Sequence, residues 1–369
     1  MDRYEAAMRR AIDISAGALG LSSPNPPVGA LLIDESGASI SDGTTQPVGG
    51  PHAEVVALAR AGDRARGATM VCTLEPCAHT GRTGPCASAL IAAGVRRVVY
   101  AVGEQNGVAA GGGQMLRAAG MEVVAGCCSD QAARGPLRYW LHAQRTGRPY
   151  VSWKLAASLD GQSAAADGSS QWITSAAARK EVHQLRSVSD AIIVGAGTVR
   201  ADDPQLTSRK SDGELRPHQP LRVVISNSAQ ISPNAKVFDG CAPTLLALGP
   251  GVSHEHAHSF PCQVVQSTGS TSEGVDLGTL LRELYERGVV HALLEGGPTL
   301  AGSFIAVSLV DEIIAYVAPK LLLSGMWPAL RGYGVETIAD AIELEFDEVT
   351  RVGPDLRITC SIVRTSTQD

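Results

Sequence analysis

The sequence has no excess of positive charge and no apolar stretch long enough to span a bilayer. Its 31 lysine and arginine residues stand against 37 aspartate and glutamate residues, which gives a formal net charge of −6. A general nucleic-acid binder usually carries the opposite balance, because phosphate contacts require lysine and arginine. A membrane-spanning helix needs about 20 consecutive apolar residues, and the polar start of the chain lacks the apolar core of a signal peptide. We therefore expect neither a nucleic-acid partner nor a membrane partner.

Cysteine is sparse, and glycine follows no fixed period. Eight cysteines in 369 residues are too few for a disulfide scaffold, so we expect reduced thiols in a soluble cytoplasmic protein. The 40 glycines show no regular spacing, which excludes collagen and low-complexity structures. With 44% hydrophobic and 18% charged residues, the chain can bury a core. Its length predicts one large domain or two of medium size.

Both halves of the chain alternate short apolar segments with amphipathic segments of about ten residues, a pattern typical of α/β sheets covered on both faces. A polar stretch with a glycine and a proline, 145–149, separates the halves, so we predict two α/β domains, 1–147 and 148–369. The predicted strands are 28–33, 69–74, 95–102, 150–157, 190–194, 221–226, 244–248, 289–294, 311–318 and 356–363. The predicted helices are 52–61, 86–93, 176–187, 277–287 and 298–307, and the predicted loops include 208–220 and 249–275.

A set of metal-binding residue types lies in the first half. His52 and Glu54 form an H-x-E pair, and Cys77 and Cys86 each follow a proline. Two thiolates and one imidazole supply three ligands and leave zinc a fourth position for water, whose pKa the ion lowers towards ~7. Glu54 would then carry the proton to a leaving amine. Each residue alone fits a helix cap or a buried thiol, but the ordered set between predicted strands favours one zinc ion per chain.

The segment 73–86, with the sequence TLEPCAHTGRTGPC, resembles the deaminase half of the bifunctional riboflavin-biosynthesis deaminase/reductase family, and 24–29 and 51–54 match the same family. The resemblance implies a cytidine-deaminase-like three-layer domain. It also implies hydrolytic removal of the 2-amino group from 2,5-diamino-6-ribosylamino-4(3H)-pyrimidinone 5′-phosphate. By this likeness Asn25 would hold the pyrimidine and Arg82 would lie near the substrate. His79 is either a further substrate contact or a solvated loop histidine.

One segment departs from the family pattern. After the strand that ends near Val102, the family typically has Asp-Pro-Asn-Pro and then a Gly-x-Gly turn. This chain keeps Asn106 but lacks the aspartate and both prolines within 104–113. The resemblance therefore does not predict that this loop is rigid, or that it contacts the ribose phosphate.

Polar and glycine-rich clusters follow the apolar strands of the second half, where open α/β sheets build ligand clefts. Gly296 and Gly297 allow backbone amides to approach a ligand closely, and a helix that begins near Pro298 presents its positive end, which suits a phosphate. The Gly-Ala-Gly at 195–197 is not a dinucleotide-binding fingerprint, because the third glycine is missing and Pro204 stops the following helix.

These clusters match the reductase half of the same family, whose fold is dihydrofolate-reductase-like. The resemblance implies hydride transfer from NADPH to ribose C1′ of 5-amino-6-(5-phosphoribosylamino)uracil, which converts the ribosyl group to ribityl. The NADPH contacts that it implies are Ala156, Trp172, Thr198, Asp202, Ser228, Gly296, Gly297, Pro298 and Thr299. The substrate contacts that it implies are Lys154, Ser170, Arg186, Leu206, Arg209 and Glu295.

Two other functions share part of this pattern. A nucleic-acid deaminase has the same H-x-E and Pro-Cys elements, but the acidic net charge and the reductase-like half argue against it. A non-catalytic nucleotide-binding protein with relict sites would fit the altered 104–113 loop, but the intact His52, Glu54, Cys77 and Cys86 argue against that. We interpret 254–258, with three histidines, as a solvated loop and not as a metal site. We expect phosphorylated ribosylaminopyrimidines as substrates and a homo-oligomer.

Overall fold

The computed structural model describes residues 2–79, 84–105, 107, 109–268, 274–332 and 334–363. The chain forms two compact units, residues 1–148 and 149–369. Each unit has a sheet and a core of its own, and each is described by itself below. Within the described residues, every helix is too short or too polar to span a membrane.

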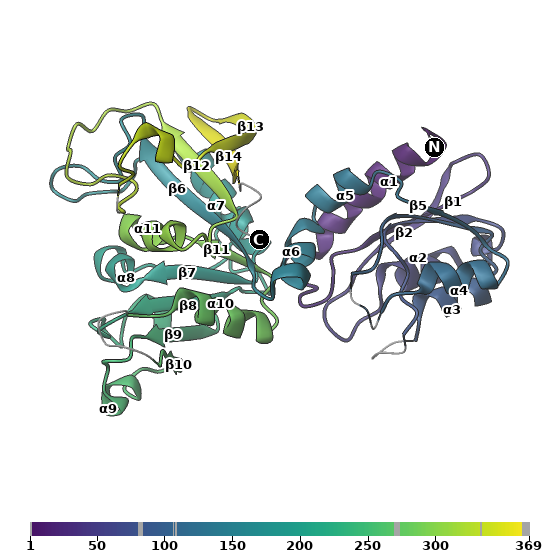
Figure 1. Ribbon diagram of the computed structural model, residues 1–369, viewed down its shortest axis with the longest axis horizontal. Helices are drawn as coiled ribbons and strands as arrows, with labels where there is room; N and C mark the ends of the chain where they lie inside the picture. The colour runs from purple at the N-terminus through teal and green to yellow at the C-terminus, as the bar shows by residue number, and fades with distance from the viewer. Residues whose placement is uncertain are drawn as a thin grey trace. The chain divides into compact units, whose positions relative to one another are not determined.

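The N-terminal unit is built on a five-stranded mixed sheet in the order β2-β1-β3-β4-β5. Strand β1 pairs antiparallel with β2 and β3, whereas β3, β4 and β5 run parallel. Figure 1 shows α1 and α5 on one side of the sheet and α2, α3 and α4 on the other. The strands are β1 (Gly29–Ile33), β2 (Ser39–Thr44), β3 (Thr69–Leu74), β4 (Arg97–Val102) and β5 (Glu122–Ala125). The helices are α1 (Asp2–Ser15), α2 (Ala53–Ala61), α3 (Cys86–Ala92), α4 (Gly112–Ala118), α5 (Ser129–Arg134) and α6 (Arg138–Thr146).

Two glycines let the helices approach this sheet closely. A Cβ at Gly29 would lie 1.9 Å from the carbonyl oxygen of Ala11 in α1, and one at Gly43 would lie 2.2 Å from the carbonyl oxygen of Ala53 in α2. Larger residues at these positions would push the helices outward, because such contacts are far below van der Waals distance. The start of α2 is thereby held against β2, and it carries His52 and Glu54.

The C-terminal unit is built on a nine-stranded sheet in the order β10-β9-β8-β7-β11-β6-β12-β14-β13. All neighbours from β10 to β12 run parallel, and β14 pairs antiparallel with both β12 and β13. The strands are β6 (Tyr150–Ser158), β7 (Ala191–Gly195), β8 (Leu221–Ser226), β9 (Thr244–Leu248), β10 (Gln263–Gln266), β11 (His291–Leu294), β12 (Glu312–Ala318), β13 (Leu344–Val352) and β14 (Asp355–Ile362). The helices are α7 (Ala176–Ser187), α8 (Ala196–Asp202), α9 (His254–Ala257), α10 (Leu277–Glu286) and α11 (Pro298–Ala306).

Helices cover both faces of this sheet. On one face, Leu281 of α10 and Phe304 of α11 pack against strand residues such as Val151. Val199 of α8 packs in a second cluster with residues of β7, β8 and β9, and Val182 of α7 packs against Tyr316 of β12. The prediction of two α/β units with sheets covered on both faces is confirmed.

The predicted loop at 249–275 is wrong in two places. The short helix α9 lies within it, capped by the side chain of Ser253, and the four-residue edge strand β10 follows. The histidines at 254–256 are therefore helical and not part of an irregular loop. Strand β13 was also not predicted, because its apolar alternation changes phase at Glu348, where the pairing register shifts, and several of its residues are charged. Edge strands tolerate such charges, since one of their sides faces solvent.

Candidate active sites

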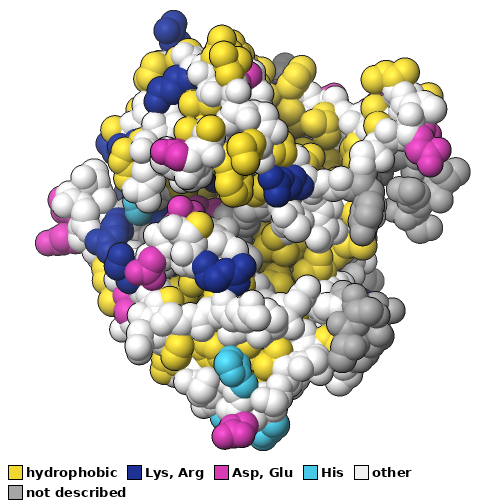
Figure 2. All heavy atoms as spheres, turned by 90° about the vertical axis from the view of Figure 1, so that its left-hand side faces the viewer, with side chains coloured by type: hydrophobic (Ala, Val, Ile, Leu, Met, Phe, Trp, Pro, Cys, Tyr) yellow, Lys and Arg dark blue, Asp and Glu magenta, His cyan; other side chains and the backbone are white. Residues whose placement is uncertain are grey.

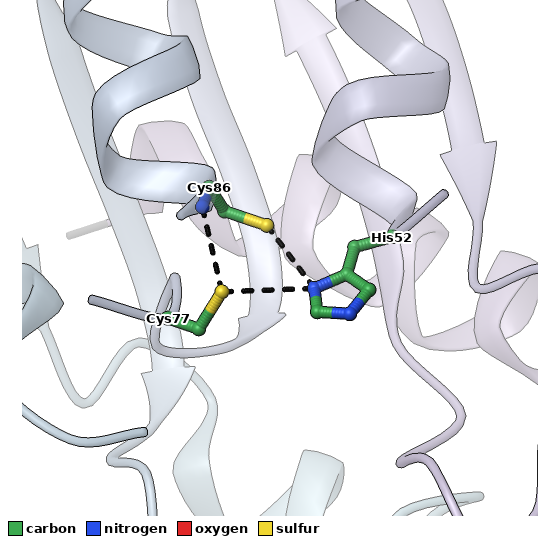
Figure 3. Close-up of side chains that lie close together, drawn as sticks. All are labelled: His52, Cys77 and Cys86. Atoms are coloured by element: carbon green, nitrogen blue, oxygen red, sulfur yellow. Dashed lines mark hydrogen bonds between the residues drawn. The ribbon is translucent and has the colours of Figure 1, made fainter. Parts of the chain in front are cut away.

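Three potential zinc ligands converge in the N-terminal unit (Figure 3). His52 caps the start of α2, Cys86 begins α3, and Cys77 lies in the turn after β3. His52 Nδ1 lies 3.2 Å from Cys86 Sγ and 3.7 Å from Cys77 Sγ. The three ligand atoms all lie within 4.8 Å of one another. The start of α2, the start of α3 and the turn after β3 thus bring together three residues that are up to 34 positions apart in the sequence.

These distances fit zinc. A tetrahedral ion with Zn–S near 2.3 Å and Zn–N near 2.0–2.1 Å places sulfur and nitrogen ligands about 3.6 Å apart. The two observed nitrogen–sulfur distances, 3.2 and 3.7 Å, bracket that value. Three protein ligands of this kind leave a fourth position open, as in catalytic zinc sites.

The electrostatics of the two thiols also suit a cation. A hydrogen bond from Cys86 lowers the pKa of Cys77 to about 4, with further help from His52 and from the backbone N–H of Cys86. The same shared hydrogen bond, together with burial, raises the pKa of Cys86. The hydrogen bond to Cys77 raises the pKa of His52. The surroundings therefore favour the thiolate form at Cys77, and a bound divalent cation would favour it at Cys86 as well.

Glu54 lies in the first turn of α2 and is only 4% exposed. Burial raises the pKa of its carboxyl group, and His52 and Cys86 are among the groups that influence it. A carboxyl group with a raised pKa beside a metal site can both accept and release a proton near neutral pH. Glu54 is therefore a buried carboxyl group two residues from His52, on the turn that begins α2.

A cavity of about 1150 Å³ lies in the C-terminal unit. The carboxyl ends of β7, β8 and β11 open into it, on the side of the unit that Figure 2 shows as hollowed. The Oγ1 atom of Thr198 accepts a hydrogen bond from the backbone N–H of Gly297 at 3.2 Å, which joins the start of α8 to the start of α11. The predicted residues that line the cavity are Ser170, Thr198, Asp202, Ser228, Gly297, Pro298 and Thr299.

A half-buried charged cluster lies at the end of β11. Arg186 of α7 makes a bidentate ion pair with Glu295, at 2.6 and 2.9 Å. Burial opposes the ionisation of Glu295, but Arg186, Lys154 and His183 together outweigh it and lower the pKa of Glu295. Burial lowers the pKa of Lys154 on β6, and the nearby Glu295 partly offsets this shift. Three predicted substrate contacts thus come together from three elements.

Residues 149–358 match the family of the RibD C-terminal domain, and residues 1–102 match the zinc-binding region of cytidine and deoxycytidylate deaminases. The chain is 49% identical over 355 residues to riboflavin biosynthesis protein RibD of Mycobacterium tuberculosis, with 96% of each chain covered. It is 40% identical over 363 residues to RibD of Escherichia coli, with 95% of this chain and 97% of that one covered.

The chain belongs to the RibD family. The solved structure of Acinetobacter baumannii RibD, form 1, superimposes with a TM-score of 0.88 at 35% identity and covers 98% of this chain and 99% of that one. A diaminohydroxyphosphoribosylaminopyrimidine deaminase/5-amino-6-(5-phosphoribosylamino)uracil reductase from Thermotoga maritima gives a TM-score of 0.84 at 29% identity, with the same coverage. The prediction of a bifunctional deaminase and reductase of riboflavin biosynthesis is confirmed.

Three further residues of the N-terminal unit, Asn25, Arg82 and His79, are considered as substrate contacts from the resemblance. Asn25 is half-buried in the turn before β1, where its backbone N–H donates to Ser22, and Arg82 lies outside the described residues. The Nδ1 atom of His79 is buried without a hydrogen-bond partner in the described part of the chain. These three assignments stay predictions.

In the C-terminal unit, some predicted contacts lie outside the cavity lining. Trp172 is 61% exposed, with the Arg179 guanidinium 4.2 Å above its ring. Arg209 donates to the carbonyl oxygen of Gly213 at 2.7 Å, and Leu206 is buried. Ala156 and Gly296 are likewise not part of the lining that the described residues form.

The cavity also has charged lining residues that the sequence analysis did not select. Arg200, Asp276 and Arg331 reach it from three separate segments. Arg200 could have been found, since it lies between Thr198 and Asp202 on one short helix. Arg331 could not, because only the folded loop brings it to α11, where its backbone N–H donates to Pro298.

Proposed function

We propose that the N-terminal unit hydrolytically removes the 2-amino group of 2,5-diamino-6-ribosylamino-4(3H)-pyrimidinone 5′-phosphate. We further propose that the C-terminal unit reduces the ribosyl group of 5-amino-6-(5-phosphoribosylamino)uracil to ribityl with NADPH. The observation that carries the proposal is the convergence of His52, Cys77 and Cys86 beside the buried Glu54, in a chain whose second unit has a cofactor-sized cavity. The name of the Thermotoga maritima relative, which joins both activities, supports it.

In the deaminase, the three ligands would hold zinc and Glu54 would move protons. When bound, zinc supplies Lewis-acid chemistry that makes a water molecule acidic near neutral pH. The Glu54 carboxylate would accept a proton from the attacking water and deliver it to the leaving amine nitrogen. Asn25 and Arg82 would contact the substrate.

In the reductase, NADPH supplies a hydride when bound. Thr198 and the backbone at Gly297, at the start of the nine-residue helix α11, would face its phosphate groups. Hydride addition at C1′ breaks the bond from C1′ to the ring oxygen, and that oxygen then needs a proton. Lys154 is the half-buried cation whose lowered pKa suits this donation. The other proposed cofactor contacts are Ala156, Trp172, Asp202, Ser228, Gly296, Pro298 and Thr299, and the other proposed substrate contacts are Ser170, Arg186, Leu206, Arg209 and Glu295.

A coupled assay on the purified protein tests both halves. Ammonia release and NADPH oxidation should follow from the same diaminopyrimidine substrate. Absence of ammonia release would contradict the deaminase proposal, and absence of NADPH oxidation on the deaminated compound would contradict the reductase proposal.

Cys86→Ser should lower zinc content and deamination together, because a serine hydroxyl is a poor substitute for a buried thiolate ligand. Zinc per chain, measured by atomic absorption, should fall well below the wild-type value. NADPH oxidation on pre-deaminated substrate should persist, since this variant leaves the C-terminal unit unchanged. Wild-type zinc content in Cys86→Ser would contradict the ligand assignment.

We also propose that a second copy of the chain covers an apolar surface on the C-terminal unit, since monomers rarely expose so many large apolar side chains in one region. β13 is the edge strand of the sheet, where a strand of a second copy would pair. The exposed side chains that define this surface are Leu321, Leu323, Met326, Leu330, Val335, Ile338, Ile342, Leu344, Phe346, Val349, Leu356 and Val363.

Phe346→Asp should therefore convert the assembly to monomers, because it puts a charge where an apolar side chain, 69% exposed in one chain, is to be covered. Light scattering coupled to size-exclusion chromatography gives the mass. Val48→Asp is the matched control, since Val48 is an exposed apolar residue of the other unit. A monomeric wild type, or an unchanged mass in Phe346→Asp, would contradict this surface.

A further inference from the structure

The altered segment 104–113 packs against the turn that carries Cys77. A Cβ at Gly112 would lie 1.6 Å from the carbonyl oxygen of Pro76, so the start of α4 touches this turn directly. The backbone N–H of Ala78 donates to Ala109 at 3.0 Å. The side chain of Ala109 packs with Cys77 and Cys86 in one buried cluster. The segment therefore forms a wall of the metal site, although 106 and 108 lie outside the described residues.

One carboxylate fixes both ends of this segment. The Oε1 atom of Glu75 accepts from the backbone N–H of Gly113 at 2.8 Å, and its Oε2 atom accepts from the backbone N–H of Glu104 at 3.1 Å. The backbone of Glu75 is itself anchored, because its N–H donates to Val102 of β4 at 2.8 Å. Glu75 directly follows β3 and lies two residues before Cys77, so it links the end of the sheet, the segment and the ligand turn.

We propose that Glu75 is a positioning residue of the deaminase, whose carboxylate holds the 104–113 segment against the Cys77 turn and so keeps Cys77 in place for zinc. The proposal rests on the zinc site proposed above. This segment lacks the prolines that would stiffen its backbone, so its ends depend on hydrogen bonds. Charged acceptors make the stronger hydrogen bonds to backbone N–H groups. Mutation of residues that orient metal ligands in this way typically lowers metal affinity 10- to 100-fold.

The test measures zinc release from the full-length, zinc-loaded protein to a colorimetric chelator. Glu75→Ala should release zinc about 10- to 100-fold faster than wild type, as for other residues that orient ligands. Glu75→Gln should fall between the two, because its amide has an accepting oxygen at one of the two positions and an NH2 donor at the other, where it would face a backbone N–H. In the cobalt-substituted protein, Glu75→Ala should also change the thiolate-to-cobalt absorption, which a general loss of stability would not do.

Gln105→Ala is the matched control. The Gln105 side chain belongs to the same segment, but its hydrogen bond goes to the carbonyl oxygen of Gly103 and not to the ligand turn. This variant should release zinc at the wild-type rate. NADPH oxidation on pre-deaminated substrate and the melting temperature monitor folding, and if Glu75→Ala does not fold, Glu75→Gln decides.

Two results would overturn the inference. Wild-type zinc release and cobalt absorption in Glu75→Gln and Glu75→Ala would show that Cys77 needs no such support. If Gln105→Ala released zinc as fast as Glu75→Ala, any change in the 104–113 segment would weaken zinc binding. The Glu75 carboxylate would then have no specific role in holding Cys77. A wild-type protein that binds no zinc at all would instead overturn the ligand set of the proposed function, and this inference with it.

Discussion

Glu54→Gln should keep one zinc per chain and lower the deamination rate by ~100-fold or more, the range typical of general acid–base groups. Glutamine has nearly the same size and fills the same buried position, but it cannot accept and release a proton near neutral pH. The three ligand side chains are unchanged, so the metal should stay. Ammonia release under substrate saturation, together with zinc content, measures both parts of this prediction.

Asp63→Asn is the control for Glu54→Gln, since it makes the same change of carboxylate to amide at an exposed position just beyond α2. It should leave both zinc content and turnover unchanged. Two outcomes would count against the proposed role. Near-wild-type turnover in Glu54→Gln would mean that another group moves the proton, and loss of zinc from that variant would mean that Glu54 helps to hold the metal.

The group of candidate metal ligands could be predicted from sequence because its residues follow local rules. H-x-E places a ligand and a carboxyl group on one turn at a helix start, and each cysteine follows a proline near an element boundary. Apolar strands such as 69–74 could be predicted as well, since they are buried on both faces and carry no interrupting charge. What the pattern could not show is the distance between the ligands, which depends on how three elements end at one edge of the sheet.

The reductase residues show more clearly what cannot be predicted from the sequence. The resemblance named Arg186 and Glu295 separately, as two substrate contacts. The structure joins them in a bidentate ion pair across 109 positions of the chain, beside Lys154. No local periodicity predicts such a contact, because it depends on how α7, which packs against β12, brings Arg186 to the residue that follows β11. For the same reason, the role of Glu75 becomes visible only when both ends of the 104–113 segment are seen on one carboxylate.

Lys154→Ala should abolish NADPH oxidation and leave ammonia release intact, so that 5-amino-6-(5-phosphoribosylamino)uracil accumulates. The Lys154 ammonium group is the proposed proton donor to the ring oxygen that leaves C1′, and alanine removes it without changing the proposed zinc ligands. Since the donor must be protonated, the wild-type reduction rate should fall as the pH rises through the pKa of Lys154, which burial holds below the usual value for lysine. Product analysis by chromatography and NADPH absorbance follow the two reactions separately.

Asp202→Ala separates the cofactor side of the reductase from the substrate side. Asp202 lines the cavity, so its loss should weaken NADPH binding, measured by fluorescence titration, whereas Lys154→Ala should bind NADPH as wild type does. Lys210→Ala is the control, since its exposed side chain pairs with Glu214 four residues along the same loop; it should change neither reaction. Loss of ammonia release in Lys154→Ala or Asp202→Ala, with zinc retained, would show that the two activities are not housed in separate units. Normal NADPH oxidation in Lys154→Ala would show that a group other than Lys154 protonates the ring oxygen. The half-buried pair of Arg186 and Glu295 would then have no proposed proton donor beside it.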